Sequence, residues 1–424
     1  MNTRLYNARL LKLVNCTDIE CGEIWVEGNR ITYIGGAKDS SSVEWDKEID
    51  CEGNVLMPGF KNVHTHSGMT AFRSLADDLN LQDWLNTMIF PREAVMTGED
   101  IYWLTKLAIL EYLTTGVTLI SDMYLTPDTI LQACDEMGMR CEIISGLNKF
   151  GPSLEVLEER YNNLNGKSDL VGFKMGVHAE YTCDKELLEE VSKLLHKYEA
   201  PLYVHMSETS TEHNECIERY GMTPVAFFDS LGLWDFGGGI YHGVWCDEND
   251  MEIMKKRNVS ITSNPSSNLK LASGIAPIAK YLDKGILVGI GTDGPSSNNC
   301  LDMFREMFLI TALAKVKDYN PKAVPATEVL KMACVNGAVS LGHEECSNLS
   351  EGKLADIIMI DLNQPNMQPI LDIANNIVYS GSKTNIKMTM INGNILYYDG
   401  EFIDIDVDEI YEKCAQITNR LKDI

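Results

Sequence analysis

Long hydrophobic runs and basic residues are both scarce in this chain of 424 residues. No apolar stretch reaches the roughly 18 residues of a membrane-spanning helix, and residues 1–15 lack the basic start and apolar run of a signal peptide. With 36 Lys and Arg against 62 Asp and Glu, the formal net charge is −26. Such a surface repels phosphate backbones and anionic membranes, so we expect neither nucleic acid nor a membrane as a partner.

The sequence also lacks a regular cysteine pattern. Its 12 cysteines are scattered from Cys16 to Cys414 without a single CxxC. We therefore expect reduced, mostly buried thiols in a cytoplasmic protein. The chain contains no low-complexity linker and no internal repeat, and its hydrophobic content of 45% is that of an ordinary globular protein.

From residue 57 onward, short apolar segments alternate with longer amphipathic ones. The predicted strands cover residues 55–63 (interrupted by a Pro-Gly pair), 118–122, 140–146, 170–177, 202–205, 239–242, 259–263 and 287–291. The predicted helices include residues 99–115, 127–137, 184–198, 248–256, 275–284 and 300–341. Eight strands alternating with helices are typical of an α/β protein with a (β/α)₈ TIM barrel. An open doubly wound sheet would alternate similarly, but no GxGxxG follows a first strand.

Both ends of the chain are rich in short β segments. Residues 4–14, 24–27, 30–34 and 48–51 precede the barrel, and residues 354–361, 377–379, 387–391 and 394–398 follow it. Hairpin turns are predicted at Gly28 and Gly393. We predict a small β-sandwich from residues 1–57 together with 350–406, a metal-dependent barrel over 58–349, and a C-terminal helix over 407–424.

Histidines gather at the ends of the predicted strands. Side chains alternate along a strand, so two histidines one residue apart face the same side. Five of the eight histidines occupy strand ends, and the eighth strand ends in an aspartate: His64, His66, His178, His205, His242 and Asp293. On a barrel these ends converge on one bowl. The other three, His196, His213 and His343, fall in predicted helices as surface groups.

Three of these imidazoles and the carboxylate suit a single divalent metal. His64, His66, His205 and Asp293 would bind zinc or ferrous iron and leave room for a water molecule. Metal binding would lower the pKa of that water from about 15.7 to roughly 7 and so supply a nucleophile. The alternative is that His205 and Asp293 are hydrogen-bonded buried polar groups.

Two further residues are candidates for proton transfer. Glu208 follows His205 by three residues and could carry a proton from the attacking water to the leaving group, or it could cap the next helix. His242 could hydrogen-bond the metal-bound hydroxide, or it could be structural. Lys174 lies four residues before His178, too far from the strand end to bridge two metals as a carboxylated lysine does. We therefore expect one metal.

Seven short motifs lie between residues 58 and 356: PGF at 58–60, HTH at 64–66, HMSE at 205–208, HG at 242–243, SNPSSNLKL at 263–271, GTDG at 291–294 and GKLAD at 352–356. Their combination resembles the amidohydrolase superfamily. More narrowly, the motifs resemble its branch of mononuclear aminohydrolases, which includes methylthioadenosine/S-adenosylhomocysteine deaminases and triazine chlorohydrolases.

The resemblance implies roles for four more residues. In the adenosine-type deaminases, a Trp and a Glu nine residues later line the site, and the Glu holds the ribose hydroxyls. Trp84 and Glu93 have that spacing, although a helix-face aromatic and a surface acid would look the same. His178 matches a histidine that contacts the purine, and Ser297 matches a serine that lines the site.

The chain departs from the family in one respect. Members that accept S-adenosylhomocysteine hold its carboxylate with arginines after strand three. The corresponding positions here are Ser145 and Ser153, with Lys149 as the nearest cation. An uncharged 5′-substituent or plain adenosine is therefore easier to accommodate than an amino acid.

The resemblance thus implies hydrolytic deamination of an adenine nucleoside, with Glu208, His242 and Asp293 as catalytic residues. The candidates are 5′-methylthioadenosine, 5′-deoxyadenosine, adenosine and, with the reservation above, S-adenosylhomocysteine. Three alternatives stay open: an aminohydrolase or chlorohydrolase of a free base, pterin or triazine; a two-metal amidase of cyclic amides; and an inactive barrel that serves as a binding protein. The expected partner is a small molecule, and a homo-oligomer is an open possibility.

Overall fold

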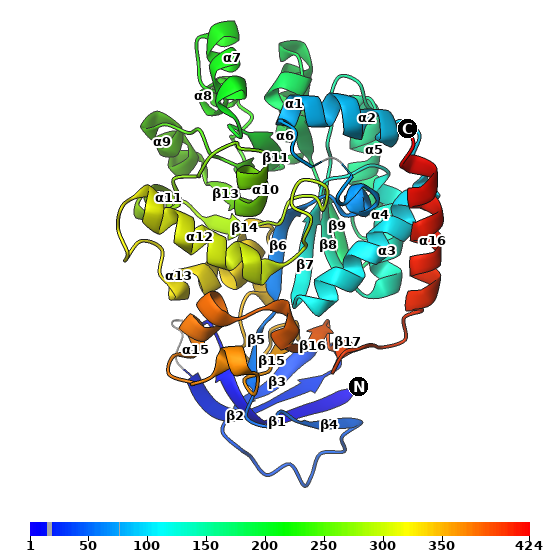
Figure 1. The fold of residues 1–424 in the computed structure, drawn as a ribbon, viewed down its shortest axis with the longest axis vertical. Coiled ribbons are helices and arrows are strands. Elements are labelled where there is room, and N and C mark those ends of the chain that lie inside the picture. Colours follow the sequence, from blue (N-terminus) through cyan, green and yellow to red (C-terminus); the bar gives the residue numbers. More distant parts are fainter. Residues whose placement is uncertain (15–18, 76) are drawn as a thin grey trace.

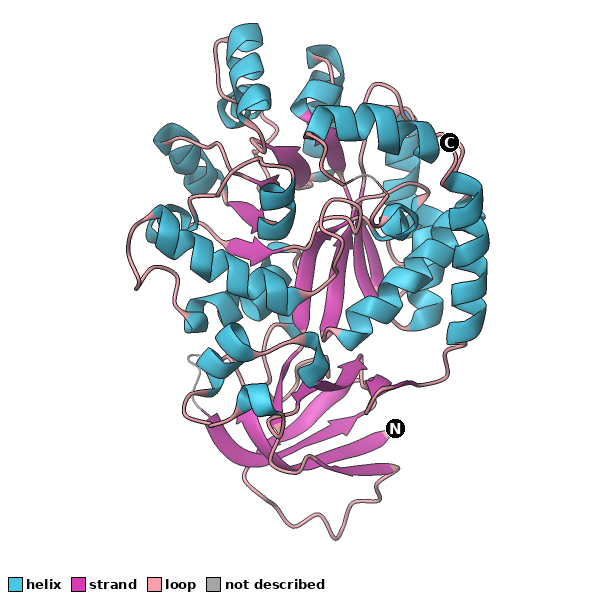
Figure 2. Cartoon of the chain, viewed as in Figure 1, coloured by secondary structure: helices cyan, strands magenta, loops and turns pink. Residues whose placement is uncertain are grey.

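The computed structural model describes residues 1–14, 19–75 and 77–424. Cys16 lies outside these residues. Strands gather in two regions, one at the bottom of Figure 1 and one in the centre, where helices surround them (Figures 1 and 2). The predicted α/β class is confirmed. No helix among the described residues is long and apolar enough to cross a membrane.

Both ends of the chain contribute strands to one sheet. Its strands are β1 (Asn2–Leu11), β2 (Ile19–Glu27), β3 (Arg30–Gly35), β4 (Lys47–Asp50), β5 (Val55–Pro58), β15 (Ile357–Ile360), β16 (Ile386–Ile391), β17 (Asn394–Tyr398) and β18 (Glu401–Phe402). Their order is β18-β17-β16-β15-β5-β1-β2-β3, with β4 paired to β1. The predicted hairpins are confirmed at Gly28, between β2 and β3, and at Gly393, between β16 and β17.

The central strands are all parallel. They are β6 (Phe60–Thr65), β7 (Val117–Asp122), β8 (Arg140–Ile144), β9 (Val171–Lys174), β10 (Gly176–Ala179), β11 (Leu202–Met206), β12 (Gly238–His242), β13 (Val259–Ser263) and β14 (Val288–Ile290). They form a sheet β6-β7-β8-β9 and a sheet β10-β11-β12-β13-β14. Every residue of β7, β8 and β11 is buried, as expected of parallel strands covered on both faces.

Helices connect these strands and enclose them. The longer ones are α3 (Gly98–Thr114), α4 (Pro127–Met137), α5 (Leu154–Leu164), α6 (Lys185–Tyr198), α7 (Ser210–Tyr220), α9 (Glu248–Arg257), α12 (Met303–Lys317) and α16 (Val407–Leu421). The shorter ones are α1 (Leu81–Asp83), α2 (Phe90–Glu93), α8 (Pro224–Ser230), α10 (Pro265–Lys270), α11 (Ile278–Asp283), α13 (Ala326–Lys331), α14 (Gly337–Ser340) and α15 (Ile373–Asn375). The C-terminal helix α16 packs along α3 (Figure 1).

Three predicted strands differ from the structure. One of them, residues 170–177, is divided into β9 of one parallel sheet and β10 of the other. Residues 55–63 are divided between two sheets, because the chain crosses from β5 to β6 at Gly59. There a Cβ atom would lie 2.1 Å from the Thr118 Cγ2 atom, so only glycine fits. Residues 377–379 form a helical turn within Asn376–Ser380, preceded by α15, whose first turn Asp372 caps. A short apolar run does not distinguish a strand from a buried helical turn.

Hydrogen bonds connect the two parallel sheets at both of their junctions. Leu147, after β8, forms a parallel bridge with Val177 of β10. On the other side, the amide of Asp293 donates to the carbonyl oxygen of His64 at 3.0 Å. The carboxyl ends of β6 and β14 are therefore adjacent, which brings residues far apart in the sequence to one place.

A buried ion pair connects the nine-stranded sheet to the parallel strands. The Arg140 guanidinium, at the start of β8, donates from Nε and Nη2 to the two carboxylate oxygens of Asp356, at 2.8 and 3.0 Å. Their side chains are 3% and 0% exposed. Burial alone would raise the pKa of Asp356, but Arg140 lowers it below its usual value.

Candidate active site

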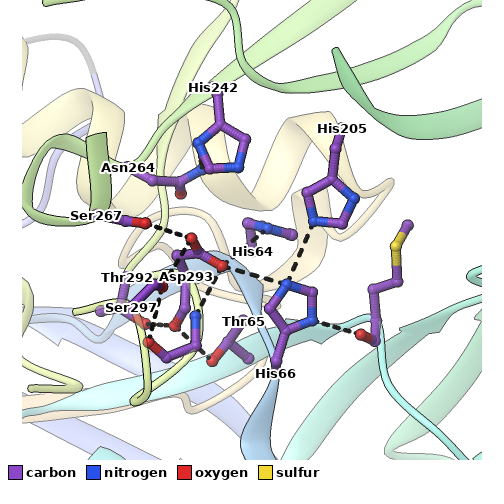
Figure 3. A network of polar contacts seen from close by, with 12 residues as sticks. His64, Thr65, His66, His205, His242, Asn264, Ser267, Thr292, Asp293 and Ser297 are labelled. Atoms are coloured by element: carbon purple, nitrogen blue, oxygen red, sulfur yellow. Dashed lines mark hydrogen bonds and ion pairs between the residues drawn. The ribbon is translucent and has the colours of Figure 1, made fainter. Parts of the chain in front are cut away.

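The ends of the parallel strands bring four histidines and one carboxylate together (Figure 3). His64 belongs to β6 and His66 follows it, while His205 and His242 belong to β11 and β12. Asp293 follows β14. Ligand atoms within 4.8 Å of one another form two overlapping groups, one of His64, His66 and Asp293 and one of His64, His205 and His242.

The distances describe a compact centre. The Oδ1 atom of Asp293 lies 3.4 Å from His64 Nε2 and 3.2 Å from His66 Nε2. The Nε2 atoms of His66 and His205 are 3.3 Å apart. All four predicted ligands are at most 9% exposed. The structure therefore brings the predicted set together in a largely buried site.

Hydrogen bonds on the far side of two rings fix their tautomers. His66 Nδ1 donates to the carbonyl oxygen of Met123 at 2.5 Å, and His205 Nδ1 donates to that of His178 at 2.7 Å. In the neutral rings, both Nε2 atoms then carry lone pairs that face each other without a proton between them. Two opposed lone pairs are unfavourable alone but are the ligands of a shared cation.

The state of His64 also fits a metal site. Within residues 1–14, 19–75 and 77–424, neither ring nitrogen of His64 makes a hydrogen bond, although both are buried. Burial lowers the pKa of His64 to about 3 and that of His205 well below its usual value, so both rings are neutral. Burial alone would lower the pKa of His66 too, but the Asp293 carboxylate raises it. The site therefore combines two neutral imidazoles, His64 and His205, with a carboxylate whose field favours positive charge.

Hydrogen bonds from neighbouring residues orient the Asp293 carboxylate. Its Oδ2 atom accepts hydrogen bonds from the hydroxyls of Ser267 at 2.5 Å and Ser297 at 3.0 Å, and Oδ1 accepts one from the Gly294 amide at 2.8 Å. Burial alone would raise its pKa, but His64 and His66 lower it well below the usual range. Asp293 is therefore an ionised and oriented carboxylate.

Glu208 and His242 lie beside this centre. The Oε2 atom of Glu208 is 3.6 Å from His242 Nε2, and the Ser273 hydroxyl donates to its Oε1 atom at 3.3 Å. His242 Nδ1 donates to Asn268 Oδ1 at 2.8 Å. Burial raises the pKa of Glu208. The alternative role of Glu208 as a helix cap is wrong, because α7 is capped by Thr209.

A cavity of about 380 Å³ opens over the centre. That volume is in the range of small-molecule sites. Its wall includes the predicted substrate residues Trp84, Glu93, His178 and Glu208, together with His66, His205, His242 and Asp293. Ser297 was predicted to line the site, but it is not among the described residues of the wall and instead donates to Asp293 from behind. Burial raises the pKa of Glu93.

The cavity wall also contains residues that the sequence analysis did not single out. Arg160, on α5, lines the cavity and forms no hydrogen bond or ion pair with any residue that the structure describes. Arg160 follows Leu157, another wall residue, by three positions, and residues at this spacing lie on the same face of a helix. Helical periodicity could therefore have assigned both residues to the wall once one of them was known to be there. Ser145 and Ser153, which the sequence analysis did single out in place of the family's arginines, line the cavity as well.

Two other expectations concern residues outside the centre. Lys174 Nζ lies 3.5 Å from Glu142 Oε2, a contact that agrees with a structural lysine. His343 precedes a short helical turn and contacts Glu142 Oε1 at 2.7 Å. Its prediction as a solvated helical residue is wrong, because the sequence does not reveal the buried carboxylate opposite it.

Comparisons with known proteins agree with this geometry. The family model described as "Amidohydrolase family" matches residues 55–396. A 5′-deoxyadenosine deaminase of Methanobrevibacter smithii is 40% identical over 95% of this chain and 94% of its own length. A 5-methylthioadenosine/S-adenosylhomocysteine deaminase of Syntrophomonas wolfei is 39% identical over 95% of both chains.

A solved structure shows the same fold. The crystal structure of an adenosine deaminase from Xanthomonas campestris with bound zinc superposes with a TM-score of 0.93 and 27% identity. The similarity covers 100% of this chain and 99% of that one.

Proposed function

Because the chain belongs to the amidohydrolase family, we propose that it deaminates the adenine ring of a purine nucleoside by hydrolysis. Water replaces the 6-amino group: a C6–O bond forms, the C6–N bond breaks, and ammonia leaves. The observation that carries the proposal is the convergence of the histidine–aspartate centre with Glu208 and Glu93 around one cavity.

The site fits one divalent cation, and we propose zinc. His64, His66, His205 and Asp293 would hold it, in agreement with the opposed lone pairs and the unbonded His64 ring. When bound, such a cation lowers the pKa of a coordinated water molecule toward neutrality. The zinc in the related adenosine deaminase structure supports the choice of metal.

Glu208 moves the protons. Its carboxyl lies at the cavity wall and its raised pKa suits a group that accepts a proton and releases it again near neutral pH. It takes a proton from water, gives it to N1 of the purine, and a second transfer completes ammonia. His242 and Asp293 hold the attacking oxygen by hydrogen bonding, and Ser297 keeps Asp293 oriented.

Glu93, Trp84 and His178 supply nucleoside recognition. Glu93 offers carboxylate oxygens to the ribose hydroxyls, Trp84 offers an apolar face, and His178 offers a ring nitrogen to the purine. Substrates with a small or apolar 5′-substituent, such as 5′-deoxyadenosine and 5′-methylthioadenosine, are supported by the names of the two relatives. Arg160 adds a cation that could pair with a carboxylate on a longer substituent.

The same proposal includes the architecture. β9 and β10 are consecutive, separated by Met175, and count as one strand, so the parallel strands make eight. We infer one closed (β/α)₈ barrel, supported by the hydrogen bonds at both sheet junctions. The predicted division into residues 1–57 with 350–406, 58–349 and 407–424 stays a proposal, as does the description of the nine-stranded region as a β-sandwich.

A substrate panel with metal analysis tests the function. Ammonia release is measured with adenosine, 5′-deoxyadenosine, 5′-methylthioadenosine, S-adenosylhomocysteine, guanine, cytosine and triazines, and the metal content of the protein is determined. We expect turnover of the adenine nucleosides and about one zinc per chain. Turnover restricted to free bases or triazines would refute nucleoside deamination, and about two metals per chain would refute the single-metal site.

A further inference from the structure

A second buried glutamate lies next to the proposed proton carrier. Glu212, on α7, is 5% exposed, and Glu208 is 4% exposed. The proposed reaction does not use Glu212. The described residues that line the cavity do not include it. Burial, together with the charge of Glu208, raises the pKa of Glu212 to about 8. Two adjacent buried carboxyl groups are costly, so their presence needs a structural or functional reason.

Both oxygens of Glu212 accept hydrogen bonds from the backbone that carries Glu208. Its Oε1 atom accepts from the Ser207 amide at 2.8 Å, and its Oε2 atom accepts from the Glu208 amide at 2.9 Å. The side chain thus reaches beyond Thr209, which caps α7. A glutamate at this helix position ordinarily bonds the amide of the capping residue itself. Here Glu212 instead accepts hydrogen bonds from the turn that precedes the helix.

That turn is backbone-strained and also supports a neighbouring loop. Ser207 has a φ of 54°, a left-handed conformation that is unfavourable for a residue with a side chain. Its carbonyl oxygen accepts hydrogen bonds from the amides of Val244 and Trp245, at 2.9 and 2.8 Å, just after His242. The conformation at Ser207 therefore sets the direction of Glu208 and connects it to the segment that follows His242.

We propose that Glu212 is a positioning residue for deamination. It acts through Glu208, by holding the Ser207–Glu208 amides so that the Glu208 carboxyl faces His242 and the cavity. This role rests on the proposed function of Glu208. It requires two acceptor oxygens, because each one bonds a different amide. A glutamine offers one acceptor, so its NH₂ group would face one of the two amide N–H groups.

A double-mutant cycle tests the role. Glu212→Gln should lower kcat about 10- to 100-fold, as expected for a displaced catalytic group, with KM changed less than about threefold and the metal content unchanged. In a Glu208→Gln background the same substitution should cause less than about a twofold further loss, because its effect requires the Glu208 carboxyl. A similar loss in both backgrounds would overturn the proposal, and so would parent-like activity of Glu212→Gln.

A matched control separates this effect from the loss of any buried carboxylate. Asp250 is fully buried and accepts hydrogen bonds from the Asp247 amide, at 3.0 Å, and from the Thr223 hydroxyl, but it does not contact Glu208. Asp250→Asn should keep kcat within about twofold. An equal loss in both variants would overturn the proposal. If Glu212→Gln does not fold, Glu212→Asp, which keeps both acceptors on a shorter side chain, takes its place in the same cycle.

One readout does not depend on turnover. A parent protein that releases no ammonia from any nucleoside refutes the proposed function by itself. The positioning role is then decided by a crystal structure of Glu212→Gln, or of Glu212→Asp if the first variant does not fold. It should show Ser207 out of the left-handed region and the Glu208 carboxyl displaced. An unchanged turn would overturn the role.

Discussion

Replacing Glu208 by glutamine removes one ionisable group and almost nothing else. The two side chains have the same shape, so the hydrogen bond from the Ser273 hydroxyl to Oε1 can be kept. Glu208 belongs to neither cluster of candidate metal ligands. We therefore expect Glu208→Gln to fold and to bind as much metal as the parent.

The loss of activity should be large because the proposed reaction passes both protons through the Glu208 carboxyl. His242 Nε2 lies 3.6 Å from that carboxyl, and the proposed role of His242 is to hold the attacking oxygen. Asp293 is fixed by its own hydrogen bonds and has a pKa well below the usual range. We expect kcat to fall at least about 100-fold, which corresponds to about 2.7 kcal/mol at 1.36 kcal/mol per factor of ten.

The assay is steady-state ammonia release from an adenine nucleoside across pH, with metal analysis of each preparation. Burial raises the pKa of Glu208, so the parent should lose kcat/KM as the pH falls through a value above about 4.3, the usual glutamate pKa. That acidic limb should be absent in Glu208→Gln. Turnover of the variant within about threefold of the parent would show that another group carries the proton.

Further predictions concern the substrate, the metal and the fold. Glu93→Ala should raise KM for nucleosides about 10-fold or more with little change for a free base, and equal effects on both would exclude ribose contact. Arg160→Ala should weaken turnover of a nucleoside with a carboxylate in its 5′-substituent relative to 5′-deoxyadenosine, and an unchanged ratio would contradict the pairing. Removal of metal by a chelator should abolish turnover and lower Tm, and added zinc should restore both. Arg140→Met should reduce the free energy of unfolding by about 3–5 kcal/mol in denaturant titrations, because Asp356 loses its buried partner. The pKa of Asp356 is lower in the folded protein than in the unfolded chain, where it is about 3.9. The stability that the pair provides is therefore fully present above about pH 3.9 and is lost as the pH falls through the pKa of the folded state.

The centre of the site was predictable because its residues lie at or just after the carboxyl ends of parallel strands. A parallel strand with a helix on each side fixes where its last residue goes, so His64, His205 and Asp293 could be assigned to one place from sequence alone. The motif resemblance then added Trp84 and Glu93, and both line the cavity.

Residues on helices were harder to place. Arg160 and Glu212 both lie on amphipathic helices, where periodicity shows which side faces the protein but not which cavity or turn a long side chain reaches. For a related reason, the sequence does not reveal that the chain crosses from one sheet to another at Gly59. The residues before and after it are all buried, and only the three-dimensional packing against Thr118 separates the two strands.

The pairing of β5 with β15 has a consequence for how the protein is made. Pro58 and Ile357 are partners in the sheet but are about 300 residues apart along the chain. At about 5–20 residues per second, a ribosome needs roughly 15–60 s to synthesise that interval. During this time the edge of β5 that β15 will later cover stays open to other polypeptides, so biosynthesis is the stage at which this protein is most exposed to misassociation.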